Sequence, residues 1–453
     1  MKVSKYSFLF CHEDNECYIY NTLSNALIEI DNDTYEILLK ARQNRSVVSE
    51  QMLGSDLYNA LCEKRMISNN DIDDFLFYKS IVHHQRTDKH HMHLTLAPTM
   101  DCCFNCHYCF EKFKTQDYMS EMTMDSIVRY LNRLDSKPQL RITWFGGEPL
   151  MALQQMEMLY TKISTLYQKP THSDIITTGF HLTPHAIEVL QKIGVESMQI
   201  TLDGLRDTHN QIKMTPNCED VFGKVMHNVE LLLQKTDIHL VFRINLTKKN
   251  AHEFVDLYKY LKERFSPYLH KLGVCPAFVL NRGDCNLSEE EIKNFFTQDE
   301  DAQFALDLFN KDGIATQFTR YPSRFFNECA IRNIMSVAFD PLGYAYKCWE
   351  VIGNRNHAFA RLTQDGLFDE VNEVILNRHL YGADPLDDPK CSQCAYLPIC
   401  NGGCPIQRIQ NVFECRNNCT CTHFKGHIAE FLRIHLHLTK AGYNNHMYKD
   451  MNK

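Results

Sequence analysis

Strand-like and helix-like segments alternate about six times between residues 93 and 278. Short runs such as 197–202 and 240–246 have the alternating apolar pattern of a strand, and a longer run of helical spacing, 220–233, separates them. This order is typical of parallel strands joined by crossover helices. Because such crossovers are right-handed, they curl the sheet into a full or partial barrel, with functional loops at the C-terminal strand ends.

The character of the sequence divides the chain into three parts. Residues 1–90 contain three short strand-like runs, at 6–10, 17–20 and 26–30, followed by helical patterns, and predict a small α+β module. Residues 91–320 hold the barrel-like alternation. In residues 321–453 the alternation fades and cysteines become frequent, so we expect a loop-rich domain held together by metal clusters.

A polar stretch from residue 68 to 91 joins the first two parts, with a helical segment near 75–81. We interpret its histidines as part of a solvated linker rather than a metal site, because no fixed helical pairing is evident. These histidines are His83, His84, His90, His91 and His93.

Composition limits the classes of function. The formal net charge of −8 does not indicate a nucleic-acid partner, and no apolar run is long enough to span a membrane. The first residues lack the apolar block of a signal peptide, so we expect a cytoplasmic protein. Nineteen cysteines in a reducing compartment indicate metal binding rather than disulfides.

Three cysteines follow the first strand of the barrel-like region. Cys102, Cys106 and Cys109 have the spacing Cys-x3-Cys-x2-Cys on one short loop. Three thiolates can hold three irons of a [4Fe–4S] cube, whereas clusters that only transfer electrons use four cysteines. The spacing therefore predicts a cluster whose fourth iron is free to bind a substrate or cofactor.

Four further cysteines near the C-terminus have the spacing Cys-x2-Cys-x5-Cys-x3-Cys. They are Cys391, Cys394, Cys400 and Cys404. Fixed spacing of four thiols is difficult to attribute to chance and predicts iron–sulfur ligands, with a zinc module as the alternative. Other cysteines are most simply ordinary thiols, namely Cys11, Cys17, Cys62, Cys103, Cys218 and Cys275.

The three-cysteine loop and its neighbours resemble the radical S-adenosylmethionine (SAM) superfamily. Tyr108 occupies the usual aromatic position before the last cysteine, and Gly146-Gly147-Glu148-Pro149 matches the family's Gly-Gly-Glu-Pro segment. The resemblance implies that SAM binds the open iron and is cleaved to a 5′-deoxyadenosyl radical. Glycines permit close backbone approach, and the carboxylate of Glu148 can accept hydrogen bonds from the SAM ammonium.

Two later strand ends extend the resemblance. It implies that Thr201 and Arg243 contact the SAM carboxylate, for which a guanidinium is well suited. One departure is Thr177-Thr178-Gly179, where relatives commonly carry Thr-Asn-Gly. The implied fold is a partial (β/α)6 TIM-like radical SAM barrel.

The C-terminal part resembles the SPASM extension of peptide-modifying radical SAM enzymes. It implies two auxiliary clusters, which we expect to be [4Fe–4S]. One would use Cys391, Cys394, Cys400 and Cys421, and the other Cys329, Cys348 and Cys404. The cluster on Cys329, Cys348 and Cys404 is either open to substrate at its fourth iron or completed by Cys285. In the other cluster, Cys415 and Cys419 are alternative fourth ligands to Cys421.

The first 90 residues resemble, more weakly, the winged-helix-like domain that binds leader peptides of ribosomally made precursors. A leader would add as a strand to the sheet edge. The alternative is a structural cap on the barrel.

Together these resemblances imply a radical SAM peptide maturase that forms a thioether or another side-chain crosslink in a precursor peptide. A reductant such as flavodoxin or ferredoxin would be its electron source. The general base is not identified, although Asp340 and Glu350 lie near the expected segment.

Two alternatives to the maturase fit the sequence less well. An anaerobic sulfatase-maturating enzyme, which forms formylglycine, generally lacks a 90-residue leading module and tends to carry Asp after the second SPASM cysteine, whereas Trp349 follows Cys348 here. A peptide-binding iron–sulfur or zinc sensor would leave Glu148, Thr201 and Arg243 without a purpose.

Overall fold

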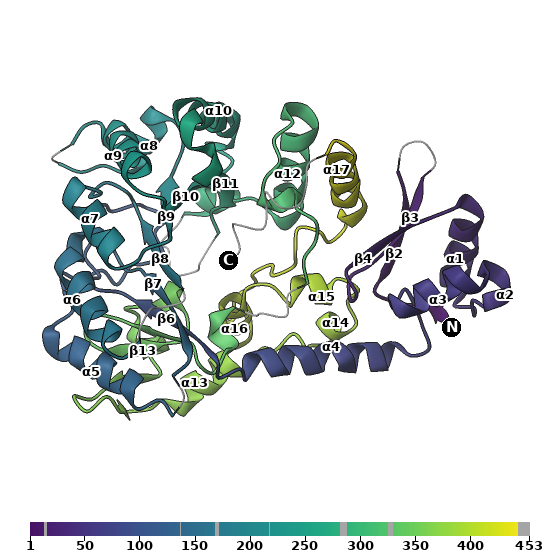
Figure 1. Cartoon of the computed structure of the whole chain (residues 1–453), viewed down its shortest axis with the longest axis horizontal. Coiled ribbons are helices and arrows are strands. Elements are labelled where there is room, and N and C mark those ends of the chain that lie inside the picture. The colour runs from purple at the N-terminus through teal and green to yellow at the C-terminus, as the bar shows by residue number, and fades with distance from the viewer. Residues whose placement is uncertain are drawn as a thin grey trace. The chain divides into compact units, whose positions relative to one another are not determined.

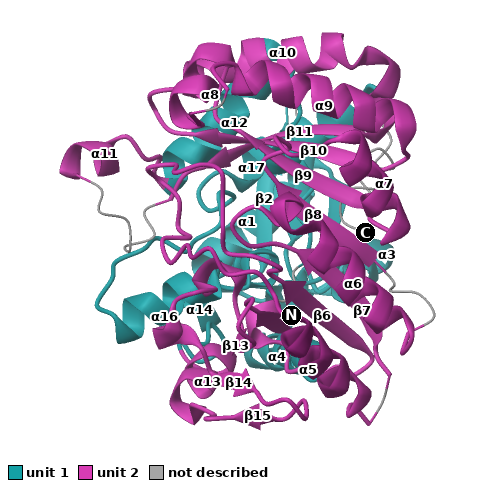
Figure 2. Ribbon diagram, turned by 90° about the vertical axis from the view of Figure 1, so that its left-hand side faces the viewer, with its two compact units in different colours: residues 1–87, 298–329, 383–453 teal, residues 88–297, 330–382 magenta. Residues whose placement is uncertain are grey.

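The chain forms two compact units in the computed structural model (Figure 2). Unit 1 comprises residues 1–87, 298–329 and 383–453, and unit 2 comprises residues 88–297 and 330–382. The structure describes residues 1–12, 16–135, 137–167, 172–216, 218–280, 288–324 and 329–442. The division into three domains at residues 90 and 320 stays a prediction. Within the described ranges, no helix is long and apolar enough to cross a membrane.

Unit 2 is built on a ten-stranded sheet in the order β11-β10-β9-β8-β7-β6-β12-β13-β14-β15. Neighbours from β6 to β11 are all parallel, and β12 pairs parallel with β6, whereas β13–β15 are antiparallel. The sheet stays open at β11 and β15, which confirms the predicted partial barrel. The strands are β6 (His91–Leu96), β7 (Gln139–Trp144), β8 (His172–Thr177), β9 (Ser197–Leu202), β10 (His239–Leu246), β11 (Leu272–Phe278), β12 (Val337–Phe339), β13 (Tyr344–Tyr346), β14 (Ala360–Leu362) and β15 (Phe368–Asp369).

Crossover helices lie along one side of the parallel strands (Figure 1). Along β7 and β9, apolar residues such as Trp144 and Ile200 are buried, and the residues between them are half-buried. One sheet face therefore forms the apolar core and the other carries polar side chains. The helices of unit 2 are α5 (Glu121–Asn132), α6 (Leu153–Ser164), α7 (Pro184–Lys192), α8 (Arg206–Ile212), α9 (Val221–Lys235), α10 (Phe254–Arg264), α11 (Glu289–Lys293) and α13 (Glu373–Leu380).

Unit 1 combines the N-terminal module with C-terminal segments. Strands β2, β3 and β4 form an antiparallel sheet in that order, and β1 pairs with β5. One core packs Phe10 and Tyr20 of this sheet against Ile399, Phe424 and Phe431. The strands are β1 (Lys2–Val3), β2 (Ser7–Cys11), β3 (Cys17–Asn21), β4 (Ala26–Ile30) and β5 (Ile67–Ser68). The helices are α1 (Asn32–Asn44), α2 (Glu50–Leu53), α3 (Ser55–Glu63), α4 (Asp71–Arg86), α12 (Gln298–Asp312), α14 (Pro389–Ser392), α15 (Leu397–Cys400), α16 (Pro405–Phe413) and α17 (Ile428–Lys440).

Helix α4 occupies most of the segment that was expected to be a solvated linker. The helix runs well beyond 75–81, with Asn70 as its N-cap and three acidic residues in its first turn. His83 and His84 lie in its last turn, where basic side chains suit the helix dipole, and His91 and His93 belong to β6. Buried Tyr78 anchors one side of α4, so tertiary packing holds that side of the helix, whereas His83, His84 and His91 are exposed to solvent as expected.

The reading of Cys11 and Cys17 as ordinary thiols was wrong. The two residues form a disulfide. The β2–β3 register places them directly opposite each other, which brings their side chains to the same face of the hairpin. Sequence composition carried no information about this pairing.

Candidate active site at the cysteine loop

The three-cysteine loop lies at the C-terminal edge of the parallel sheet, directly after β6. Cys106 is buried, and Cys102 and Cys109 are half-buried. The Cys109 amide donates to the Cys106 carbonyl at 3.1 Å, which forms a tight turn between two of the thiols. In the described part of the chain, no three His, Cys, Asp or Glu residues are grouped as ligands of one metal ion. Ligation by these thiols therefore stays a prediction.

The charges around the loop suit an anionic cluster. A hydrogen bond with the Cys103 thiol lowers the pKa of Cys102, against burial, and the charge of Lys114 adds to this effect. Burial raises the pKa of Cys106, whereas nearby Lys213 opposes that rise. Two ammonium groups, Lys114 of the loop and Lys213 at the end of α8, thus lie near soft sulfur ligands, and that donor set fits an iron–sulfur cluster.

The Gly-Gly-Glu segment after β7 packs directly against the cysteine loop. A Cβ on Gly147 would lie 2.2 Å from the carbonyl oxygen of Asp101, and the Glu148 amide donates to the same oxygen at 2.8 Å. Gly146 has φ +111°, and its Cβ would lie 2.2 Å from the Thr99 carbonyl oxygen. Glycine is required here because two backbone segments touch.

Glu148 is completely buried and fully hydrogen-bonded. Its Oε1 accepts from the Leu150 amide at 3.1 Å and from Thr177 Oγ1 at 2.6 Å. Its Oε2 accepts from the Thr178 amide at 2.8 Å and from Thr178 Oγ1 at 2.5 Å. The departure from Thr-Asn-Gly thus has a clear role, because both threonines hold this carboxylate.

Thr201 and Arg243 lie side by side on β9 and β10. The strand register pairs them directly, and Arg243 Nε lies 3.4 Å from Asn245 Oδ1. Asn245 Nδ2 donates to the Tyr108 hydroxyl at 3.1 Å, which links Tyr108 of the cysteine loop to β10. Asn245 therefore links Arg243 to Tyr108 through two hydrogen bonds.

A buried polar network at the end of β9 was missed by sequence reasoning. Tyr108 donates its hydroxyl hydrogen to Asp203 Oδ1. Lys213 Nζ lies 3.9 Å from Asp203 Oδ2, and the Asp203 amide donates to His209 Nδ1 at 3.3 Å. Burial lowers the pKa of His209 to about 4, so the ring is neutral at pH 7. Helix α8 carries His209 and leads into Lys213, but it is too short to produce a clear periodicity.

Four C-terminal cysteines, Cys391, Cys394, Cys400 and Cys421, lie in unit 1. Burial raises the pKa of Cys400 to about 11, and the charges of Cys421 and Cys394 contribute to this rise. Arg408 Nη1 lies 3.4 Å from Cys391 Sγ, and Lys425 Nζ lies 3.4 Å from Cys421 Sγ. Mutually interacting thiols beside cations fit a second cluster.

Ligation of a second auxiliary cluster by the remaining cysteines stays a prediction. Cys329 and Cys404 belong to unit 1 and Cys348 to unit 2, and Cys285 lies outside the described residues. Cys419 Sγ lies 3.8 Å from Gln298 Oε1. The other rival, Cys415, is exposed.

Asp340 is engaged in holding a turn. Its Oδ1 accepts from the amides of Leu342 and Tyr344 at 2.9 and 3.0 Å, and Tyr346 donates to Oδ2 at 3.1 Å. Arg355 also pairs with Oδ2. These contacts indicate a structural role and make Asp340 a poor candidate for the general base.

An aromatic stack adjoins the cysteine loop. Phe110 stacks on Phe145 with ring centroids 6.4 Å apart, and Phe145 stacks on Trp349 at 5.7 Å. Trp349 is exposed. The stack gives this edge of the sheet an apolar surface next to the loop.

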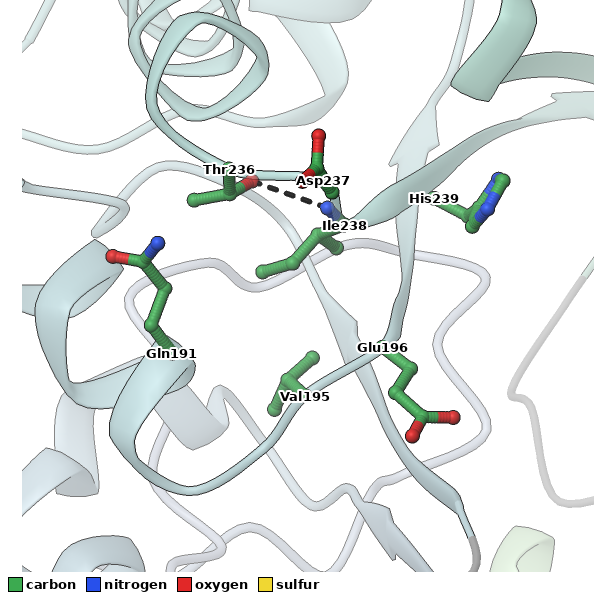
Figure 3. A pocket seen from close by; sticks show the side chains of 7 residues that line it. All are labelled: Gln191, Val195, Glu196, Thr236, Asp237, Ile238 and His239. Carbon is green, nitrogen blue, oxygen red and sulfur yellow. Dashed lines mark hydrogen bonds between the residues drawn. The ribbon is translucent and has the colours of Figure 1, made fainter.

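A hollow of about 540 Å³ lies at the opposite ends of the strands (Figure 3). Its lining includes Glu196, just before β9, and His239, the first residue of β10. Parallel strands place these residues at the N-terminal edge, away from the cysteine loop. We therefore do not assign the chemistry to this hollow.

Comparisons with known proteins agree with this placement. The family model of the radical SAM superfamily matches residues 96–261, which begin at the end of β6 and include the cysteine loop. The chain is 20% identical over 456 residues to the radical SAM cyclopropyl synthase TigE of Paramaledivibacter caminithermalis, covering 89% of each protein. It is 21% identical to the serine-type anaerobic sulfatase-maturating enzyme of Bacteroides thetaiotaomicron, covering 69% of this chain and 82% of that enzyme.

A solved structure shares the fold. Native anSMEcpe with bound AdoMet and Cp18Cys peptide aligns with a TM-score of 0.55 at 17% identity, covering 78% of this chain and 99% of the other.

Proposed function

Because residues 96–261 match the family model of the radical SAM superfamily, we propose that this chain is a radical SAM maturase that modifies a ribosomally made peptide. The observation that carries the proposal is the clamp between the cysteine loop and the Gly-Gly-Glu segment, in which Gly147 and Glu148 pack on Asp101 at the C-terminal edge of the sheet. When bound, the cluster and SAM supply a 5′-deoxyadenosyl radical that can abstract hydrogen from an unactivated carbon.

Residues of this chain then have distinct roles around the cofactors. Cys102, Cys106 and Cys109 would hold three irons, and Lys213 would balance the negative charge beside Cys106. Arg243 and Thr201, paired across β9 and β10, offer a guanidinium and a hydroxyl to a carboxylate, as the SAM carboxylate requires.

Auxiliary clusters are part of the proposal. The interacting thiols of unit 1 support one cluster on Cys391, Cys394, Cys400 and Cys421. We assign Cys329, Cys348 and Cys404 to a second cluster on their spacing alone. We propose a flavodoxin or ferredoxin in a reducing cytoplasm as the electron source.

The three-stranded sheet of unit 1 supports the proposal that the substrate is a peptide. One edge strand, β2, is covered, because Arg42 Nη1 donates to the Ser7 carbonyl at 2.5 Å and Arg433 donates to the Cys11 carbonyl at 2.9 and 3.1 Å. The other edge strand, β4, pairs only with β3 among the strands that the structure describes. An extended leader segment can therefore add to β4 by main-chain hydrogen bonds.

Sulfatase maturation remains the second candidate function, favoured by the similarity to the Bacteroides thetaiotaomicron enzyme. The open edge of β4 has no evident use in that reaction, which is why the leader-guided maturase ranks first.

Peptide modification can be tested with the anaerobically reconstituted full chain and peptides encoded by short reading frames beside its gene. We expect a mass change in one such peptide that requires SAM and a reductant. If no neighbouring peptide is modified but a sulfatase-derived Cys or Ser peptide gains formylglycine, the second candidate replaces the first.

Proline substitutions on β4 test the leader site. Of two adjacent strand amides, one faces β3 and the other faces outward. Leu27→Pro and Ile28→Pro should therefore differ in whether they break a hydrogen bond of the sheet, and only one of them should disturb the fold. The variant that keeps the native circular dichroism should lose peptide modification by at least about tenfold and keep SAM cleavage without peptide. Unchanged modification in that variant would contradict leader docking on β4.

A further inference from the structure

The loop that carries Cys391, Cys394 and Cys400 has little regular structure of its own. Its two helices, α14 and α15, are four residues long each. Helices of one turn are not stable by themselves, and their carbonyl groups find few partners within the helix. The position of the three thiols therefore depends on hydrogen bonds and packing from elsewhere in unit 1.

The N-terminal module of unit 1 supplies two donors to the middle of this loop. Lys5 Nζ donates to the Ser392 carbonyl at 3.1 Å, and Thr22 Oγ1 donates to the Ala395 carbonyl at 2.6 Å. These acceptors flank Cys394, because Ser392 precedes it by two residues and Ala395 follows it directly. Thr22 is completely buried, so water does not compete for its hydrogen bond.

Tyr78 of helix α4 holds the end of the loop. Its hydroxyl lies 3.1 Å from Asn401 Oδ1 and 3.3 Å from the Leu397 carbonyl. Asn401 directly follows Cys400 and has φ 48°, a left-handed conformation that ends α15. One hydroxyl thus contacts both ends of the short helix that carries Cys400.

Apolar packing adds to these hydrogen bonds. Cys391 packs against a core cluster that includes Tyr6 and Tyr78 of the module. The rings of Phe8 and Tyr396 also meet, with centroids 4.8 Å apart. The N-terminal module and the cysteine loop therefore share one packed core, and a shift of one requires the other to repack.

We propose that the N-terminal module is part of the auxiliary cluster site, in which Lys5, Thr22 and Tyr78 position the three cysteines of the loop. This role rests on the proposed function, which assigns a cluster to these cysteines. The three side chains act through the loop backbone, from which the thiols extend. The same module carries the proposed leader site on β4, so peptide recognition and auxiliary-cluster binding depend on one folded unit.

Iron release to a chelator tests this role in the full chain. With alanine at Cys102, Cys106 and Cys109, the iron that remains is auxiliary iron. In that background, Thr22→Val and Tyr78→Phe each remove one hydroxyl and keep the apolar shape of the side chain. We expect each variant to release about four irons per chain to EDTA at least about tenfold faster, because residues that orient metal ligands typically change metal affinity by about 10- to 100-fold.

Ser7→Ala is the matched control. Ser7 is a buried residue of the same module, and its Oγ donates to the Met66 carbonyl at 2.8 Å, so this hydrogen bond stays within the module. The variant should release iron at the rate of its background, even where its thermal midpoint falls as far as that of Tyr78→Phe. A general loss of stability would not separate the two variants.

Thiol reactivity of the iron-free full chain gives a second readout, which does not depend on a cluster. Alkylation by iodoacetamide, followed by peptide mass spectrometry, reports how often the loop opens at each cysteine. We expect Cys400 to react about fivefold faster in Tyr78→Phe than in the wild-type chain, since the variant lacks a hydrogen bond that closes the loop. Ser7→Ala should leave the rate unchanged.

The positioning role is overturned if neither Thr22→Val nor Tyr78→Phe accelerates iron release, or if Ser7→Ala accelerates it equally. A different result would concern the proposed function: a chain that holds no auxiliary iron has no cluster at these cysteines. The alkylation rates then decide the positioning role by themselves, and an unchanged rate at Cys400 in Tyr78→Phe would contradict it.

Discussion

The Glu148 amide donates a 2.8 Å hydrogen bond to the carbonyl of Asp101, the residue immediately before Cys102. This contact joins the end of β7 to the cysteine loop at the end of β6. It depends on Gly147, whose missing Cβ leaves room for the Asp101 carbonyl. The clamp gives the loop a fixed position on the sheet edge, and the proposed chemistry depends on that position.

Gly147→Ala should therefore release the loop. The new Cβ would meet the carbonyls of Met100 and Asp101 at 2.5 and 2.2 Å, and these backbone atoms cannot move aside without shifting the loop. We expect a loss of about four irons per chain, measured after anaerobic reconstitution, with the remaining iron retained. Gly313→Ala is the control for a strained but unobstructed alanine, because Gly313 has φ +67° while its Cβ would meet open space, so this variant should keep its iron. Full iron in Gly147→Ala would show that the loop does not need the clamp.

Lys213→Met should make the cluster at Cys106 harder to reduce. Lys213 is buried beside Cys106, and removing its positive charge disfavours the added electron. At the potential where the wild-type cluster is half reduced, we expect the ratio of reduced to oxidised cluster to fall about tenfold. This fall corresponds to a decrease of about 59 mV in the midpoint potential of a one-electron couple. Redox titration followed by electron paramagnetic resonance measures this, with exposed Lys235→Met as control. An unchanged midpoint potential would show that Lys213 acts only within its pair with Asp203.

Cys421 and Cys415 should differ in their effect on the auxiliary iron. Lys425 contacts Cys421 Sγ, and Cys421 shares its electrostatic surroundings with Cys400. We expect Cys421→Ala to lose about four irons while SAM cleavage continues, and Cys415→Ala to keep its iron. The reverse pattern would reassign the fourth ligand.

Acid should destabilise unit 2 through His379. Its pKa is lowered from 6.5 to about 3 by burial, with His357 and Lys347 adding to the effect. The folded state thus holds the neutral ring, and its stabilisation is present above pH 6.5 and lost as the pH falls toward 3. Between pH 7 and 5 this amounts to about 2 kcal/mol.

Thermal unfolding at pH 7 and pH 5 measures that effect. His379→Gln should show a smaller decrease in the midpoint than the wild-type chain, because glutamine does not titrate. An equal decrease in both proteins would assign the acid sensitivity to other groups.

The parallel strands could be read from the sequence because each has a strong period and lies between helices. The boundaries of β9 were expected at the residues where the structure has them, and those of β10 within one residue. Helix α4 was underestimated, because its stability comes from the packing of Tyr78 and the buried pair of Arg86 with Asp384. Both depend on residues more than 290 positions away, which local patterns do not contain.

In the candidate site, too, some residues could be predicted from local patterns and others could not. Its cysteines and glycines could be found from spacing, because their chemistry requires particular residues at particular intervals. Lys213 and His209 could not, since an isolated lysine or histidine becomes significant only when the fold buries it. The pairing of Cys11 with Cys17 was likewise invisible until the β2–β3 register was known.

The central claim is that the cysteine loop supports reductive cleavage of SAM. The most direct measurement is formation of 5′-deoxyadenosine by the anaerobically reconstituted chain with SAM and dithionite, compared with Cys106→Ala. The account predicts that the wild-type protein forms 5′-deoxyadenosine and that the variant forms none. Equal formation by both proteins, or none by a wild-type protein that carries its full iron, would contradict it.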